Sequence, residues 1–333
     1  MQYNPALDGI RALSILVVVF FHCEVPGVGG GFVGLDIFFV LSGFLITSLL
    51  AAEYRNDGIE IGRFYARRAL RLYPTLLLLV AAYLVLAPLL WPTDDRWLSA
   101  VLASTYTMDY AIAFWHAPLT IAHTWSLGVE EKFYLLWPLL LPLILKARRP
   151  IAWLVAAFLV ASAWRYFVNG TWGWAQAYFS FDTRMSGILL GAIAALVRPT
   201  ISRRVFMIAC VVLAVLIALP TVPSHRVDEA DMWRITVAEF AAVVIVSYAA
   251  AHAQSRFLSS RPMVYIGKLS YGIYIWHFPL VVLLNRAYGQ PWWVTLSATL
   301  PFAFAMAAIC YHWVDAPIKR QRRARLGSLV GSQ

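Results

Sequence analysis

The chain has 333 residues, of which 61% are hydrophobic and only 13% are charged. A soluble fold cannot bury so much apolar surface, and the modest numbers of glycine, proline and cysteine exclude collagen-like, disordered and disulfide-stapled classes. The net charge of +10 lies largely in short basic segments that border apolar runs, which indicates a lipid bilayer as the partner and not a nucleic acid. The composition therefore predicts a polytopic membrane protein.

Ten apolar runs are candidates to cross roughly 30 Å of hydrocarbon as helices. They occupy residues 9–23, 31–50, 74–91, 133–145, 151–168, 180–197, 205–220, 234–252, 266–285 and 294–314. The sequence therefore predicts an all-α fold with about ten transmembrane helices. The first run lacks a basic n-region and a cleavage site, so we expect a retained span and not a signal peptide. The stretch 98–115 is expected to be re-entrant or to lie on the outer surface, because an eleventh span would move the next basic loop outside.

Lysine and arginine are distributed unevenly between the segments that join these runs. Segments 51–73, 146–150, 198–204, 253–268 and the tail from 315 hold 5, 3, 3, 3 and 5 of them, whereas the loops on the other side hold three in all. The positive-inside rule then places both termini in the cytoplasm. We expect a transmembrane domain over 1–318 and a basic cytoplasmic tail over 319–333 that anchors on anionic lipid.

Ionisable side chains inside a membrane span cost about 2.5 kcal/mol or more each, so they mark candidate functional sites. Several of them share one predicted depth near the outer ends of the spans. They are His22, Asp36, Glu130, Glu131, Arg165, Asp182, Arg184 and Glu239. Of these we expect Asp182, Arg184 and Glu239 to contact the substrate.

A second group of charges lies at the predicted inner side. Arg11 is at the inner end of the first span, and Arg67, Arg68 and Arg71 precede the third. Arg68 and Arg71 are three residues apart and share a helical face. Two forked guanidinium groups on one face suit a phosphate, which they can bind bidentately. The alternative is an ordinary belt of cytoplasmic anchor residues.

The first span connects the two groups of charges. Arg11 and His22 are eleven residues apart, which is close to three helical turns and about 16 Å along the axis. This spacing suits coenzyme A, which carries phosphates at one end and a thioester at the other. His22 then becomes a candidate general base for a hydroxyl that attacks the thioester, with Asp36 or Glu130 holding its tautomer. The alternative for His22 is a packed histidine bonded to a carbonyl.

Five segments in a fixed order carry a resemblance to a known family. They are LDGIRALSILVVVFFH (7–22), GFVGLDIFFVLSGFLI (31–46), FYARRALRLYP (64–74), HTWSLGVEEKFYLLWP (123–138) and LSYGIYIWHFPL (269–280). Over nearly its whole length the chain resembles the acyltransferase-3 family of integral-membrane acyltransferases.

The resemblance implies transfer of an acyl group, commonly acetyl, from cytoplasmic acyl-CoA to a hydroxyl of an extracytoplasmic or membrane-facing glycan or glycolipid. It implies a multi-pass protein of the bacterial inner membrane. The family's Arg-x10-His pattern falls on Arg11 and His22, with the histidine as the essential catalytic residue. Its RxxR element falls on Arg68 and Arg71 and is implicated in acyl-CoA handling.

Two further motifs of the family fall on the second half of the chain. Its conserved glutamate corresponds to Glu130, and its Trp-His pair corresponds to Trp276 and His277, which we place among the substrate-binding residues. A buried helix-to-helix hydrogen bond and a direct catalytic role both remain open for His277. The chain departs from the family at Gly128 and Lys132, where Ser and Gln are frequent, and Lys132 is expected to pair with one of the two preceding glutamates.

A proton-coupled transporter of a polar substrate is the alternative function. It predicts two similar halves with paired glycine- or proline-interrupted spans, and the sequence has no such internal similarity. The three cysteines have no CxxC spacing, so neither a disulfide framework nor a metal site is predicted. The acceptor stays open between lipopolysaccharide, exopolysaccharide, a lipid-linked precursor and a small glycosylated molecule, and no oligomeric state is predicted.

Overall fold

The computed structural model describes residues 3–56, 58–115, 120–221 and 231–317. Within these ranges the chain is helical and contains no β-strand. The longer helices are α1 (Pro5–His22), α2 (Gly34–Asn56), α3 (Ile61–Leu90), α6 (Trp125–Lys146), α7 (Pro150–Thr171), α9 (Phe181–Val197), α10 (Arg203–Ala218), α11 (Met232–Ala251), α12 (Arg261–Val281) and α13 (Trp292–Cys310). Shorter elements are η1 (Gly31–Val33), α4 (Arg96–Ser104), α5 (Met108–Trp115), η2 (Ala122–Thr124), α8 (Trp174–Phe179), and the π-helical turns η4 (Val282–Ala287) and η5 (Tyr311–Asp315).

Eight helical stretches in the described part of the chain are long and apolar enough to cross a membrane. The other two predicted spans correspond to α6 and α10. Helix α6 has 22 residues but carries Glu130, Glu131 and Lys132, whereas α10 has only 16 residues and extends about 24 Å. The all-helical class is confirmed, while the count of ten and the cytoplasmic position of both termini stay predictions. The basic tail 319–333 lies outside the described residues, so its separation from the rest stays a prediction too.

The stretch 98–115 does not form a spanning helix. It is divided between α4, with nine residues, and α5, with eight, and each is too short to cross the hydrocarbon layer. Helix α5 packs against α6 and α8.

Helix α3 is longer than its predicted span. The sequence separates an arginine-rich approach from a span that begins at Pro74, but one helix of 30 residues runs through both. Arg68 and Arg71 are therefore placed rigidly on the same helix that enters the apolar part of the molecule.

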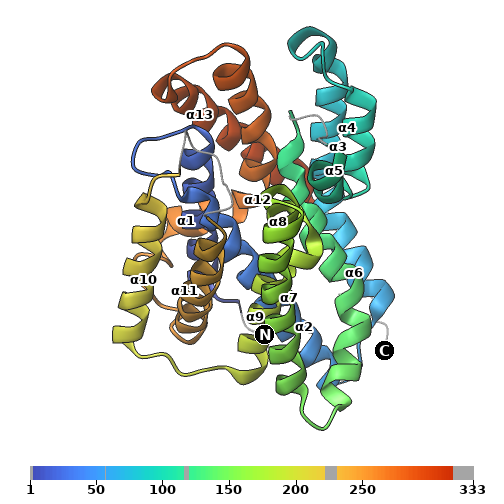
Figure 1. Ribbon diagram of the computed structural model, residues 1–333, viewed down its shortest axis with the longest axis vertical. Helices are drawn as coiled ribbons and strands as arrows, with labels where there is room; N and C mark the ends of the chain where they lie inside the picture. Colours follow the sequence, from blue (N-terminus) through green and yellow to red (C-terminus); the bar gives the residue numbers. More distant parts are fainter. Residues whose placement is uncertain (1–2, 57, 116–119, 222–230, 318–333) are drawn as a thin grey trace.

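Helix α1 lies in the interior and packs extensively against α12 and also against α2, which in turn packs on α9. Figure 1 shows α10 and α6 on opposite flanks with these helices between them. The contact between α1 and α12 is very close, because a Cβ atom built on Gly267 would lie 2.0 Å from the carbonyl oxygen of Asp8. Only glycine allows the two backbones to meet at this distance. This contact sets the position of both helices in the candidate site.

Candidate functional site

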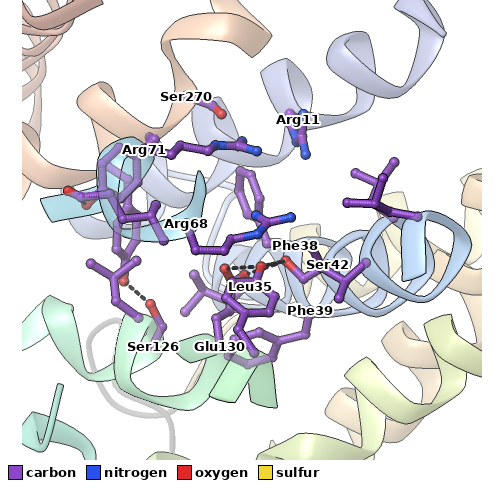
Figure 2. Close-up of a pocket in the computed structure, with 18 residues that line it drawn as sticks. Arg11, Leu35, Phe38, Phe39, Ser42, Arg68, Arg71, Ser126, Glu130 and Ser270 are labelled. Atoms are coloured by element: carbon purple, nitrogen blue, oxygen red, sulfur yellow. Dashed lines mark hydrogen bonds between the residues drawn. The ribbon is translucent and has the colours of Figure 1, made fainter. Parts of the chain in front are cut away.

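A cavity of about 340 Å³ opens between α1, α2, α3, α6 and α12. Arg11, Arg68 and Arg71 line it together with Glu130. Figure 2 shows the three arginines directed toward the same space, with Glu130 below Arg68. The structure thus brings together the three arginines that the sequence separates by as many as 60 residues. We call this cavity the arginine pocket.

The charge in the arginine pocket is predominantly positive. Arg11 has one ion pair, with Asp8 at 3.1 Å. The guanidinium of Arg68 stacks 4.7 Å from the centre of the Tyr134 ring, which supports the planar group while leaving its edge N–H donors available. Arg67, in contrast, is bound to Glu53 at 2.7 Å. The arrangement can bind an anion that enters among several guanidinium groups.

Glu130 lies on the floor of the arginine pocket and not beside His22. Its carboxylate accepts hydrogen bonds from the hydroxyls of Ser42 at 2.8 Å and Tyr134 at 3.0 Å. The expectation that Glu130 orients His22 is therefore not met in this structure. One turn of α6 separates Glu130 from Tyr134, so both face the pocket.

Asp36 also has another partner. It pairs with Arg184 at 2.8 Å, and both side chains are fully buried. The Arg184 guanidinium lies within 6 Å of three ring centres, those of Phe39, Trp125 and Tyr178. Arg184 is therefore enclosed by aromatic rings and cannot reach a substrate at the surface. Asp36 is the counter-ion of Arg184 and not the hydrogen-bond partner of the His22 imidazole.

The hydrogen bond that we expected His22 to make with a carboxylate is made with a second histidine. Nδ1 of His22 lies 2.9 Å from Nε2 of His277. Nδ1 of His277 lies 2.7 Å from the carbonyl oxygen of Tyr274. The helix-to-helix hydrogen bond that the sequence left open for His277 thus exists, and it joins α12 to the histidine on α1.

A third histidine, His123, completes the cluster. Its ring centre is 5.7 Å from that of His277, and its Nε2 is 3.1 Å from the carbonyl oxygen of Ile275. Burial lowers the pKa of His123 well below its usual range, and His277 lowers it further, so the ring is neutral near pH 7. Sequence reasoning did not select His123, although it begins one of the five family-like segments.

Tyr274 and Ser126 join the arginine pocket to the histidine cluster. Both line the pocket, and their hydroxyls are 2.6 Å apart. The Tyr274 hydroxyl also donates to the carbonyl oxygen of His123 at 2.6 Å. His22 itself does not line the pocket. Tyr274 therefore lines the arginine pocket and also contacts the histidine cluster, and the sequence did not indicate this contact.

Two other predicted substrate residues, Glu239 and Asp182, do not line the arginine pocket. Glu239 is fully buried and pairs with Arg165 at 3.0 Å, and Asp182 accepts hydrogen bonds from Tyr110 and Trp164. Both carboxylates are thus held by protein groups between helices.

Trp276 is also buried, with 7% of its surface exposed, and it packs edge-on against Phe302 of α13. It therefore faces away from the histidine cluster, although it precedes His277 in the chain.

Lys132 does not pair with a glutamate of its own helix. Its ammonium group lies 2.8 Å and 2.9 Å from the two carboxylate oxygens of Asp109 and 2.7 Å from the carbonyl oxygen of Tyr106. Gly128 allows this contact, because a Cβ atom there would be 2.7 Å from the same carbonyl oxygen. The two departures from the family pattern therefore act together to dock the segment before α6. Among the described residues, no group of three or more His, Cys, Asp or Glu side chains is arranged so that it could hold a metal ion.

The described residues form a helical protein with eight candidate membrane-spanning helices and a cavity lined by three arginines. Residues 4–312 match the family model described as an acyltransferase domain. The chain therefore belongs to the acyltransferase-3 family, and the resemblance in its motifs is confirmed.

The chain is also similar to proteins that are named O-acetyltransferases. O-acetyltransferase OatA of Staphylococcus aureus (strain NCTC 8325 / PS 47) is 33% identical over 96% of this chain and 58% of its own length. The putative peptidoglycan O-acetyltransferase YrhL of Bacillus subtilis (strain 168) is 30% identical over 96% of this chain and 55% of its own. The chain thus spans little more than half the length of these relatives. No solved structure matches it.

Proposed function

We propose that the protein is an O-acyltransferase of the bacterial cytoplasmic membrane. It moves an acyl group, acetyl in the first instance, from cytoplasmic acyl-CoA to a hydroxyl of a glycan on the outer side. The observation that carries this proposal is the arrangement on α1, where Arg11 lines a pocket with two further arginines and a partly exposed His22 ends the same helix. The family match and the helices long enough to span a membrane support it.

The residues of the arginine pocket fit a phosphate-bearing donor with a slender apolar arm. Arg11, Arg68 and Arg71 supply donors for phosphate oxygens. Apolar side chains form part of the remaining wall, among them Leu35, Phe38, Leu45, Ile46, Leu49 and Leu72. Acyl-CoA combines these two chemistries, and a thioester lying beyond Tyr274 comes within reach of the histidine cluster.

His22 acts in this proposal as the general base. Its ring accepts the proton of the acceptor hydroxyl while that oxygen bonds to the thioester carbonyl carbon. The carbon–sulfur bond then breaks, and the sulfur takes up the proton from the imidazolium. The products are the ester of the glycan and free coenzyme A, so His22 returns to its neutral form. Base catalysis of this type contributes about 10²–10⁴-fold to a rate.

We propose a cell-wall glycan as the acceptor. The name of the Bacillus subtilis relative refers to peptidoglycan, and that relative is a longer protein than this chain. Membership of an acyltransferase family favours this function over the proton-coupled transporter that the buried charges also suggest.

The test uses the purified chain in nanodiscs with radiolabelled acetyl-CoA and soluble peptidoglycan fragments. His22→Gln is expected to lower the transfer rate by about 10²–10⁴-fold with little change in donor affinity. Arg68→Ala and Arg71→Ala are each expected to weaken acetyl-CoA binding by about 1.5–3 kcal/mol. Arg63→Ala is the matched control, because Arg63 is on the same helix but is exposed and pairs with Glu60. Equal transfer by wild type and His22→Gln would refute the role of His22, and equal binding by all arginine variants would refute the donor site.

A further inference from the structure

The two imidazole rings of His22 and His277 form a hydrogen-bonded pair whose protons can be assigned from their partners. Nδ1 of His277 faces the carbonyl oxygens of Tyr274 at 2.7 Å and Ile273 at 3.2 Å. Carbonyl oxygens only accept hydrogen bonds, so this nitrogen must carry a hydrogen. In the neutral ring the other nitrogen, Nε2, then holds a lone pair and is an acceptor.

This assignment decides the state of His22. Its Nδ1 lies 2.9 Å from Nε2 of His277, and one of the two nitrogens must donate. If His277 is neutral, the donor is Nδ1 of His22. The alternative is a doubly protonated His277, which would place a charge on a fully buried ring. Burial disfavours such a charge unless an anion compensates it.

The nearby acids do not provide that anion. Asp36 is bound to Arg184, and Glu130 accepts hydrogen bonds from Ser42 and Tyr134 in the arginine pocket. The third ring of the cluster, His123, is neutral, and Arg286 stacks 5.5 Å from the ring centre of Phe278, which packs on His22. The surroundings therefore favour two neutral imidazoles.

We infer that His277 is a positioning residue that holds His22 in its Nδ1–H tautomer and thereby presents Nε2 of His22 as the basic nitrogen. The role of that nitrogen as proton acceptor rests on the proposed function, whereas the tautomer follows from the hydrogen bonds alone. No hydrogen-bond partner of Nε2 of His22 is present in the described part of the chain. His22 also keeps some exposure, while His123 and His277 are buried.

Packing holds the same ring plane in place. The Phe278 ring meets His22 edge-on at 4.9 Å between centres, and it lies 4.9 Å from His123 on another side. The close contact of Gly267 with the backbone of Asp8 positions α12 against α1 several turns away. The two histidines are thus placed by the helix pair itself and not by a loop.

A neutral imidazole in this position differs from the carboxylate of a hydrolase triad. It selects the tautomer but brings no negative charge to a site whose donor pocket is built to attract phosphates. When Nε2 of His22 gains a proton, the hydrogen bond to His277 becomes charge-assisted and shortens. His277 therefore stabilises the His22 imidazolium by accepting the hydrogen bond from its Nδ1–H group, and no anion is needed for this.

The experiment reads the tautomer and the rate separately. The chain contains 7 histidines, so the full-length protein labelled with ¹⁵N-histidine gives few imidazole signals, and the one lost in His22→Gln is assigned to His22. We expect the wild-type signal to show an Nδ1–H tautomer. His277→Leu removes the acceptor at similar volume, whereas His277→Gln keeps an acceptor oxygen. Thermal unfolding of each variant checks that it is folded.

In His277→Leu we expect His22 to populate both tautomers and the kcat for acetyl transfer to fall roughly 10- to 100-fold, a part of what a general base contributes. The KM for acetyl-CoA should stay unchanged, because the arginine pocket is intact. His277→Gln should recover much of both the tautomer and the rate.

Two results overturn the inference. One is an Nε2–H tautomer of His22 in the wild type, and the other is an unchanged Nδ1–H tautomer in a folded His277→Leu variant. A wild type that transfers no acyl group but shows the Nδ1–H signal would instead refute the proposed function and leave the tautomer assignment standing.

Discussion

The buried pair of Arg165 and Glu239 provides a sharp test of how the interior charges are used. Both side chains are fully buried, with Nη1 of Arg165 3.0 Å from Oε1 of Glu239 and Nη2 3.4 Å from Oε2. The Ser186 hydroxyl donates to Oε1 of Glu239 at 2.6 Å. Arg165→Met leaves this carboxylate with one hydroxyl and no counter-charge, which should cost about 3–5 kcal/mol of unfolding free energy. Folded proteins typically have only about 5–15 kcal/mol in total.

A double variant separates the lost pair from the stranded charge. Arg165→Met with Glu239→Leu removes both charges, so stability should return close to that of the wild type. Unfolding of the purified protein in detergent can be followed by the fluorescence of its 14 tryptophans. Arg63→Met is the control, because its pair with Glu60 is exposed and contributes little. A double variant as unstable as Arg165→Met would refute the reasoning. A stable double variant that binds the acyl donor but no longer transfers the acyl group to the acceptor would instead support a substrate-binding role for Glu239.

Two further predictions concern helix contacts. Gly267→Ala places a Cβ atom 2.0 Å from the carbonyl oxygen of Asp8 and should lower both the thermal unfolding midpoint and the transfer rate. Gly62→Ala is the control, because the position has open space around it, and its midpoint should be equal to that of the wild type or higher. Equal midpoints for the two variants would contradict the close contact at Gly267. Lys132→Met strands the buried carboxylate of Asp109 and should lower the midpoint, and adding Asp109→Leu should restore it. If adding Asp109→Leu did not restore the midpoint, the destabilisation by Lys132→Met would not come from the unpaired charge of Asp109.

The class of the protein, most of its helices and the charged residues that line its arginine pocket could be predicted from the sequence. Apolar runs and basic segments are local properties of the chain, and the spacing between Arg11 and His22 depends only on helical geometry. Helical spacing and predicted depth selected Arg68, Arg71 and Glu130, the family-like segments selected them again, and all three line the pocket with Arg11. Each of these inferences depends only on residues within one helix or one short motif.

The partners of the buried charges could not be predicted in this way. A carboxylate at a suitable depth can face any of several helices. Which helix it faces depends on how each helix is rotated about its axis, and this rotation could not be predicted from the sequence. Asp36 therefore looked like a partner of His22, but it lies against Arg184, which is 148 residues away in the chain. Lys132 likewise reaches Asp109 on another helix because the backbones meet closely at Gly128.

The sequence by itself indicated a helical membrane chain of the acyltransferase-3 family, with Arg11 about three turns before His22 on one helix, because composition, helical period and motif order are properties of consecutive residues. Only the tertiary structure decided that His277 and not an acid meets His22, and that Tyr274 and Ser126, which line the pocket, also contact the histidine cluster. Those contacts depend on how closely α1 and α12 approach and at what rotation, which is set by packing across residues far apart in the chain.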